Sequence, residues 1–219
     1  LFPEHIPVIH RTEELKELFK KYPNLDRNYI ASAAWADNRE RMEKDWELFR
    51  PYADPAFLKD LRKPNHFRGR LWEMEFGCLL LQQGHKLTPK NKKDGPDLEP
   101  PDFYVQCVGA RGDQGVNALS PPIADGELRE VPHNKIKLRI ANALDSKRKQ
   151  YRNWADEGKI NPDKPRVIAI NLGALGWWPM MERGVPSATE EVLFGFGNEV
   201  IHIDRKTLKE TGVSRELAF

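Results

Sequence analysis

The sequence predicts an α/β protein: a mixed central sheet flanked by helices. Two observations carry this prediction. From residue 67 onward, amphipathic helical stretches alternate with short apolar runs, and those runs are bounded by Pro, Gly or Asn. Because residues 1–66 show only helical patterns, we expect them to form an N-terminal helical extension. Residues 67–219 would then form the α/β core.

Composition and charge place the chain among ordinary globular proteins. Of its 219 residues, 39% are hydrophobic and 31% are charged, a balance typical of a soluble globular protein. The formal net charge is only +2, so a nucleic-acid-binding surface would have to be a local patch. Cys78 and Cys107 each lie in an apolar segment, and we expect buried thiols rather than a disulfide framework.

Nothing in the sequence suggests a membrane protein. No apolar run approaches the roughly 20 residues that a membrane-spanning helix needs, and the first residues lack a signal pattern. The sequence begins with Leu1 instead of Met, and we expect this to be a processed or trimmed start. We expect a cytoplasmic location.

The N-terminal half predicts three long helices. Residues 12–21 open with a capping threonine, carry acids in the first turn and end with lysines. A second helix is expected over about 28–49, ended by Pro51. Residues 67–83 carry a broad apolar stripe and predict a strong helix, and Gly84 fits its C-terminal stop.

Short strands and a long loop follow these helices. Residues 85–88 and 104–108 predict strands, separated by a turn with local positive charge. Residues 109–134 are rich in Gly, Pro and Asp and predict a long loop. A loop of this length in a compact domain is usually functional or mobile.

The C-terminal part predicts a basic helix and two more strands. The helix covers residues 135–154, and residues 165–171 have the nearly continuous apolar pattern of a buried central strand. A further helical turn is expected at 190–194 and an edge strand at 199–204.

One stretch has the order of residues that a metal site needs. The helix at 67–83 carries Glu73, the sequence Gly-Pro-Asp97 follows, and then comes an apolar strand that contains Gln106. Hydrolysis of a phosphodiester needs a hard divalent cation, usually Mg²⁺, held by carboxylate oxygens. A nearby lysine commonly orients the water or stabilises charge. The order therefore points to a metal site built from a helix and two adjacent strands.

This order resembles the PD-(D/E)xK, or restriction-endonuclease-like, superfamily over about residues 67–171. The resemblance implies a four-stranded mixed sheet with flanking helices and Mg²⁺-dependent cleavage of DNA. It implies that Asp97 is the principal metal ligand and that Glu73 is the helix acid. Gln106 stands where the motif has Glu or Asp, and Val108 stands where it usually has Lys.

Two departures from the motif leave alternatives open. Lys147 or Lys149 on the basic helix could replace the missing lysine in space. The amide carbonyl of Gln106 can still bind a metal, but it brings no negative charge, so Mg²⁺ binding should weaken. Three interpretations follow: an inactive relative, an active site that uses another acid such as Asp102 or Glu99, or a Glu-to-Gln substitution made to trap a complex.

Each candidate residue also has an ordinary structural interpretation. Glu73 could be a solvent-facing or capping acid beside Arg70, and Asp97 could form a turn with Gly95. Lys147, taken alone, could be a solvated lysine on a helix. It is the order of the elements that favours a site.

Basic residues on and before the 135–154 helix predict contacts with phosphates. Arg139, Lys149 and Arg152 on this helix could neutralise the DNA backbone. Glycine beside Arg111 would let the preceding loop approach a groove. The alternative is a solvated helix face.

We therefore expect a metal-dependent deoxyribonuclease that cuts double-stranded DNA, with restriction-type chemistry. Asp97, Glu73 and Gln106 would bind Mg²⁺ or Mn²⁺, and Lys147 would orient the nucleophile or stabilise charge. A homodimer would permit a cut in both strands. The alternative is a non-catalytic member of the same fold that binds nucleic acid or a partner protein. A structural protein with an accidental motif is a third, weaker alternative.

Overall fold

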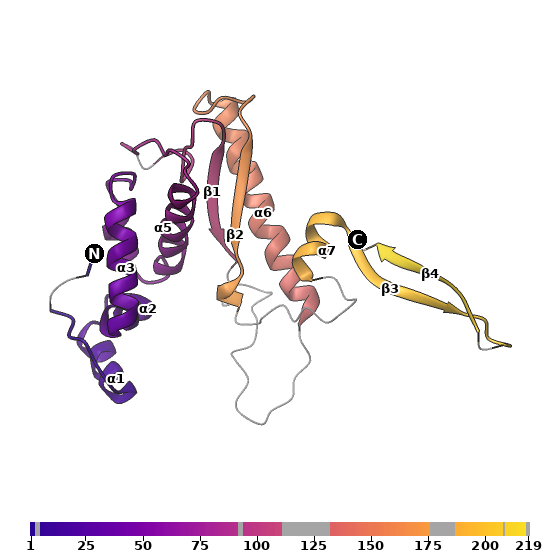
Figure 1. The fold of residues 1–219 in the computed structure, drawn as a ribbon, viewed down its shortest axis with the longest axis horizontal. Helices are drawn as coiled ribbons and strands as arrows, with labels where there is room; N and C mark the ends of the chain where they lie inside the picture. The colour runs from indigo at the N-terminus through magenta and orange to yellow at the C-terminus, as the bar shows by residue number, and fades with distance from the viewer. Residues whose placement is uncertain (3–4, 92–93, 111–131, 176–186, 208, 218–219) are drawn as a thin grey trace. The chain divides into compact units, whose positions relative to one another are not determined.

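The structure is a computed structural model, and helices and strands are both present in it (Figure 1), as the sequence predicts. It describes residues 1–2, 5–91, 94–110, 132–175, 187–207 and 209–217. The chain divides into two compact units, one formed by residues 1–109 with 147–171 and the other by residues 110–146 with 172–219. The predicted division into residues 1–66 and 67–219 stays a prediction.

Helices make up the N-terminal half of the first unit. They are α1 (Thr12–Lys21), α2 (Arg27–Ala34), α3 (Ala36–Phe49), α4 (Phe57–Leu61) and α5 (Phe67–Gln82). The predictions at 12–21 and 67–83 are confirmed. The single helix predicted over 28–49 is wrong, because the backbone of Trp35 is extended, with φ −86° and ψ 123°, and separates α2 from α3. Trp35 packs against the hydrophobic core, so the position of this large side chain outweighs helix propensity.

The core of the first unit lies among α2, α3, α5 and the first strand. Its fully buried side chains include Tyr29, Phe49, Met74 and Val105. Gly77 of α5 permits a close approach to α3, because an added Cβ would lie 2.5 Å from the ring atom Cε2 of Phe49. Packing at this point fixes α5, the helix that carries Glu73.

The sheet of the first unit pairs β1 (Tyr104–Gly109) with β2 (Arg166–Asn171) in parallel. Leu98 adds an isolated antiparallel bridge to Val105, so both kinds of pairing meet on β1. The predicted strands at 104–108 and 165–171 are confirmed in position. No strand forms at 85–88, and that prediction is wrong.

The environment of β2 differs from the prediction of a buried central strand. Among the described residues β2 pairs only with β1, and Val167 is 37% exposed. An apolar run cannot by itself distinguish a central strand from one that is covered on a single side.

Helix α5 and the C-terminal half of α6 (His133–Asp156) lie on opposite sides of the β1–β2 pair (Figure 1). On the α5 side, the indole N–H of Trp72 donates to the carbonyl of Ala169 at 2.9 Å. On the α6 side, Tyr151 donates its hydroxyl to the carbonyl of Val167 at 3.0 Å, within a cluster that includes Tyr104. The helix predicted at 135–154 is confirmed by α6, and its C-terminal half belongs to the first unit.

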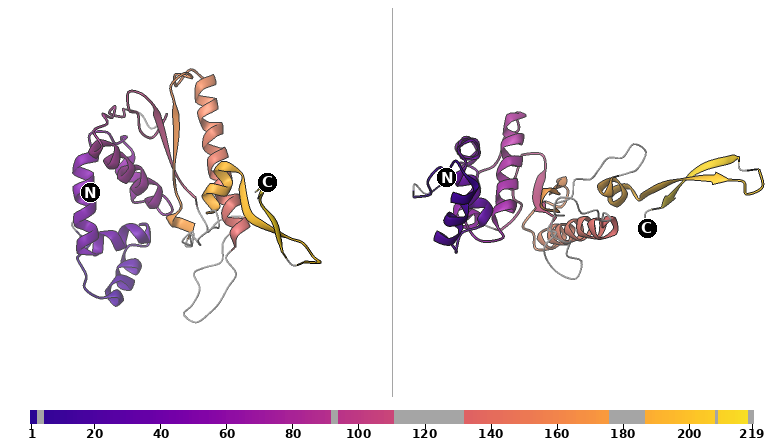
Figure 2. Two further views of the ribbon diagram at one scale, coloured as in Figure 1. Left: turned by 45° about the vertical axis from the view of Figure 1, so that its right-hand side comes forward. Right: turned by 90° about the horizontal axis from the view of Figure 1, so that it is seen from below.

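The second unit contains a short helix and a β-hairpin (Figure 2). Its later elements are the 3₁₀ turn η1 (Gly173–Leu175), α7 (Ala188–Phe194), β3 (Phe196–Ile203) and β4 (Glu210–Leu217), and β3 pairs with β4 in antiparallel fashion. The helical turn at 190–194 and the strand at 199–204 are confirmed. Most of the predicted 109–134 loop lies outside the described residues. Across the described parts of the chain, no helix has both the length and the apolar character needed to cross a membrane.

Candidate functional site

Glu73 is a buried carboxylate held by its own helix. It is 3% exposed, so the alternative that it faces solvent is wrong. Arg70, one turn earlier on α5, donates from Nη1 to Glu73 Oε2 at 2.7 Å. The other oxygen, Oε1, is buried and has no hydrogen-bond partner among the residues that the structure describes. The helix therefore fixes one oxygen of Glu73 and leaves the second available to another group.

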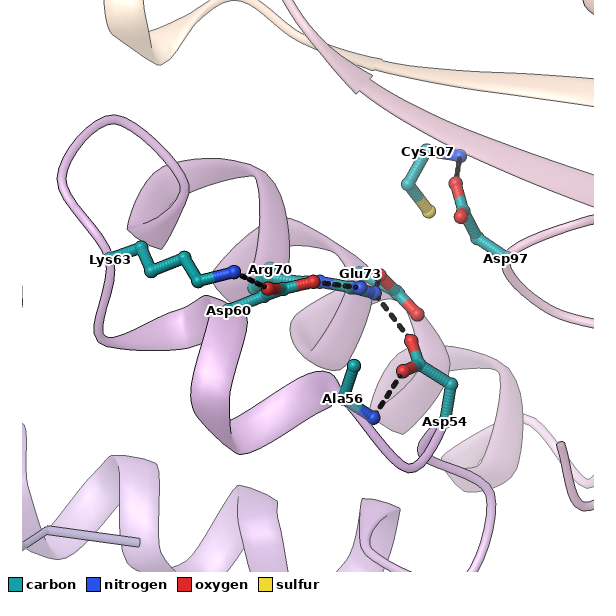
Figure 3. Close-up of polar contacts among 8 residues, drawn as sticks. All are labelled: Asp54, Ala56, Asp60, Lys63, Arg70, Glu73, Asp97 and Cys107. Atoms are coloured by element: carbon teal, nitrogen blue, oxygen red, sulfur yellow. Dashed lines mark hydrogen bonds and ion pairs between the residues drawn. The ribbon is translucent and has the colours of Figure 1, made fainter. Parts of the chain in front are cut away.

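Arg70 also joins Glu73 to two further buried acids (Figure 3). Its guanidinium lies 2.8 Å from Asp54 Oδ2 and 3.1 Å from Asp60 Oδ2, and Lys63 donates to Asp60 Oδ1 at 2.7 Å. Burial disfavours the charged guanidinium, but Glu73, Asp54 and Asp60 outweigh it and raise the pKa of Arg70. The sequence reasoning paired Arg70 with Glu73 but missed Asp54 and Asp60, whose positions depend on packing between helices.

Asp97 lies just before β1 and is anchored to its backbone. Its Oδ2 accepts a hydrogen bond from the backbone N–H of Cys107 at 2.8 Å. Figure 3 shows this contact. Burial, followed by the negative charges of Asp97 and Glu73, raises the pKa of the Cys107 thiol well above its usual range. The thiol is thus neutral, and it lies in the field of both carboxylates.

The pairing register brings Asp97 and Gln106 together. Leu98 and Val105 exchange two backbone hydrogen bonds, at 3.1 Å and 2.9 Å. In antiparallel pairing, the residue before Leu98 lies across from the residue after Val105, so Asp97 and Gln106 occupy adjoining positions. Gln106 is 3% exposed, and its Oε1 is a second buried oxygen for which the described part of the chain offers no hydrogen-bond partner.

Glu73 is close enough to Asp97 for its pKa to respond to the Asp97 charge. Burial, followed by the negative charge of Asp97, raises the pKa of Glu73 to about 7, against the opposing effect of Arg70. Burial also raises the pKa of Asp97, while the positive charges of Lys147 and Lys90 act to lower it. Two carboxylates and two lysines therefore share one region of the first unit.

The two lysines come from different elements. Lys147 projects from α6, is half-buried and donates to Gln150 Oε1 at 3.2 Å. Lys90 precedes Asp97, and its charge acts on Glu73 as well as on Asp97. The sequence reasoning found Lys147 and missed Lys90. The only signal for Lys90 was its place beside a positively charged turn.

The oxygens of Glu73, Asp97 and Gln106 are of the chemical kind that hard divalent cations prefer. Glu73 and Asp97 supply carboxylates, and Gln106 supplies an amide carbonyl; Mg²⁺ typically takes one or two carboxylates and keeps several waters. Within the described residues, no three His, Cys, Asp or Glu side chains are grouped closely enough to hold a metal ion. Of the alternative acids, Asp102 is exposed and Glu99 is half-buried. The oxygen set is therefore two carboxylates and one amide.

The predicted DNA-contacting residues lie on α6, apart from one. Lys149 and Arg152 are exposed on this helix and Arg139 is half-buried. Arg111 lies outside the described residues.

Comparisons of the chain with protein-family models, with curated proteins and with solved structures returned no match. A function for this chain must therefore be proposed from the arrangement of Glu73, Asp97, Gln106 and the two lysines.

Proposed function

We propose that the chain is a Mg²⁺-dependent endonuclease of the restriction-endonuclease-like fold that hydrolyses DNA and is impaired by Gln106. The observation that carries the proposal is the Leu98–Val105 bridge, which sets Asp97 beside Gln106. The response of the Glu73 pKa to the charge of Asp97 adds the helix acid to this pair. Mixed pairing on β1, between two helices, is consistent with the core that the resemblance implies.

The residues of the site have distinct roles in the proposed reaction. Asp97, Glu73 and Gln106 would hold Mg²⁺ through their oxygens. When bound, Mg²⁺ lowers the pKa of a water and neutralises charge that develops on the phosphate. Arg70 holds one oxygen of Glu73, which orients the other. Lys147 supplies positive charge where negative charge develops on the substrate.

Gln106 determines how well this site would work. Replacing a carboxylate by an amide removes one negative charge from the ligand set and should weaken Mg²⁺ binding. The chain would therefore carry the residues of a nuclease site but bind its metal weakly.

The surroundings of the site suggest how DNA would be bound. Arg139, Lys149 and Arg152 on α6 would contact phosphates of double-stranded DNA, and a homodimer would allow both strands to be cut. We place the protein in the cytoplasm, where the free thiols of Cys78 and Cys107 would stay reduced.

Restoring the acid tests the proposal. We expect Gln106→Glu to nick and linearise a supercoiled plasmid in Mg²⁺ or Mn²⁺ at least about tenfold faster than the parent chain, because the third carboxylate returns. The matched control is Asp97→Asn in the same background, which keeps the shape of the side chain and should abolish cleavage. Failure of Gln106→Glu to cut with either metal would reject the nuclease.

A second candidate is a non-catalytic protein of the same fold that binds nucleic acid or a partner protein. In the described part of the chain no three His, Cys, Asp or Glu side chains form a group that could hold a metal ion, and this favours it. This candidate predicts no cleavage by the parent or by Gln106→Glu. If nucleic acid is the ligand, binding of a DNA duplex would persist and weaken steeply with salt.

A further inference from the structure

The segment before Asp97 runs alongside it. The backbone N–H of Thr88 donates to the carbonyl of Glu99 at 3.0 Å, and the chain reverses direction between these two residues. Moving two residues forward from Thr88 and two back from Glu99 reaches Lys90 and Asp97. This hydrogen bond and the reversal of the chain bring Lys90 and Asp97 to neighbouring positions.

Side-chain alternation places Lys90 on the same face as the rest of the site. Positions on the other face of these three segments lie in the hydrophobic core: Leu87, Leu98 and Val105. Because successive side chains of extended backbone point to opposite faces, Lys90, Asp97 and Gln106 share the remaining face.

The charge of Lys90 acts on two carboxylates of the site. Lys90 is half-buried and makes no hydrogen bond or ion pair with any described residue. Its positive charge acts on both Asp97 and Glu73, and that of Lys147 acts on Asp97. Two ammonium groups from separate elements thus act on one carboxylate.

We propose that Lys90 is a catalytic residue of this site and contacts the scissile phosphate of the substrate. This inference rests on the proposed function and deepens it. Lys90 supplies the positive charge that the motif would place at Val108, and it does so from the segment on the far side of Asp97. Gln106 carries no negative charge that would repel a phosphate. Lys90 and Lys147 therefore also hold a phosphodiester in the absence of metal.

Binding of a short DNA duplex in EDTA tests the phosphate contact without any need for cleavage. We expect Lys90→Ala to weaken binding by about threefold to tenfold and to reduce the slope of log Kd against log salt by about 1, the value for one phosphate contact. Lys90→Arg keeps the charge and should bind like the parent. The control is Lys86→Ala, an exposed lysine of the same segment. Equal affinities and slopes for Lys90→Ala and Lys86→Ala would overturn the inference.

Cleavage in the Gln106→Glu background tests the catalytic role and separates the two proposals. We expect Lys90→Ala to lower kcat by about 100-fold or more, as loss of a charge-stabilising group does, with a much smaller change in KM. If Gln106→Glu cuts and the added Lys90→Ala leaves kcat unchanged, Lys90 is not catalytic and the nuclease stands. If Gln106→Glu never cuts but Lys90→Ala still weakens DNA binding, the phosphate contact stands and the nuclease falls.

Discussion

Arg70 forms ion pairs with a group of buried acids that includes a candidate metal ligand. One guanidinium contacts Asp54, Asp60 and Glu73, and all three acids are at most 4% exposed. Buried charges are costly unless they are paired, and removing one partner leaves the others uncompensated. The structural role of Arg70 and its orientation of Glu73 therefore depend on the same contacts.

Loss of Arg70 should be severe for stability. We expect Arg70→Met to lower the free energy of unfolding by about 3–5 kcal/mol, the usual cost of breaking a buried pair. Urea denaturation would measure the loss. Arg68→Ala, an exposed arginine on the same helix, should change stability by no more than about 0.5 kcal/mol. Similar losses in the two variants would contradict the role given to Arg70.

The raised pKa of Glu73 makes a prediction about pH. Its pKa is about 7 in the folded chain against an ordinary value of 4.5, so between these values the folded state holds more protons than the unfolded state. Stability must then fall as pH rises from about 4.5 to about 7. We expect Glu73→Gln, measured in EDTA from pH 5 to 8 by urea denaturation, to lack this part of the decline. Parallel curves for parent and variant would show that Glu73 titrates normally.

Glu73, Asp97 and Gln106 could be selected from the sequence, whereas Lys90 could not. The three residues follow one another in a recognisable order of helix, Pro-Asp and strand. The position of Lys90 depends on which residue of the preceding segment pairs with Glu99, and one residue of slip would turn it to the other face. The composition and the spacing of residues do not reveal which residue of the preceding segment lies opposite Glu99.

At the scale of elements, the packing of α5 against α3 decides where Glu73 lies. Gly77 is buried where these helices meet, and the ring it faces belongs to Phe49, which is 0% exposed. A buried ring has little room to move, so any added volume must displace a helix. Glycine fits this contact between α5 and α3 because it has no side chain, although its helix propensity is low.

Two glycines of the same helix give a matched test of that contact. We expect Gly77→Ala to lower the free energy of unfolding by about 1–3 kcal/mol through overpacking. Gly69→Ala, where no atom lies within 4 Å of the added Cβ, should raise it by about 0.5–1 kcal/mol. Thermal and urea denaturation would both measure the difference. A gain in both variants would mean that α3 and α5 do not pack as described.

Long periodic elements could be predicted from the sequence, and short ones could not. Helices α1, α5 and α6 have enough turns for the apolar period to show. The break at Trp35 and the five-residue helix α4 arise from tertiary packing, which overrides local propensity. Strand β4 is polar and is defined by its pairing with β3, so its sequence offers little alternation to detect.

At the scale of the whole molecule, charge argues for local rather than general attraction to DNA. The net charge is +2, so affinity would come from the lysines of the site and from the basic residues of α6. The predicted class, a protein of mixed helix and strand, is confirmed. The restriction-endonuclease-like core remains a proposal, because pairing among the described residues of the first unit is limited to β1, β2 and the bridge at Leu98.

Calorimetric titration with Mn²⁺ tests most directly whether Glu73, Asp97 and Gln106 form a cation site. We expect Gln106→Glu to bind Mn²⁺ at least about tenfold more tightly than the parent chain, because a third carboxylate joins the ligand set. Adding Asp97→Asn to Gln106→Glu should remove that gain. Equal Mn²⁺ affinity in the parent and in Gln106→Glu, or a gain that survives the loss of the Asp97 carboxylate, would contradict the site.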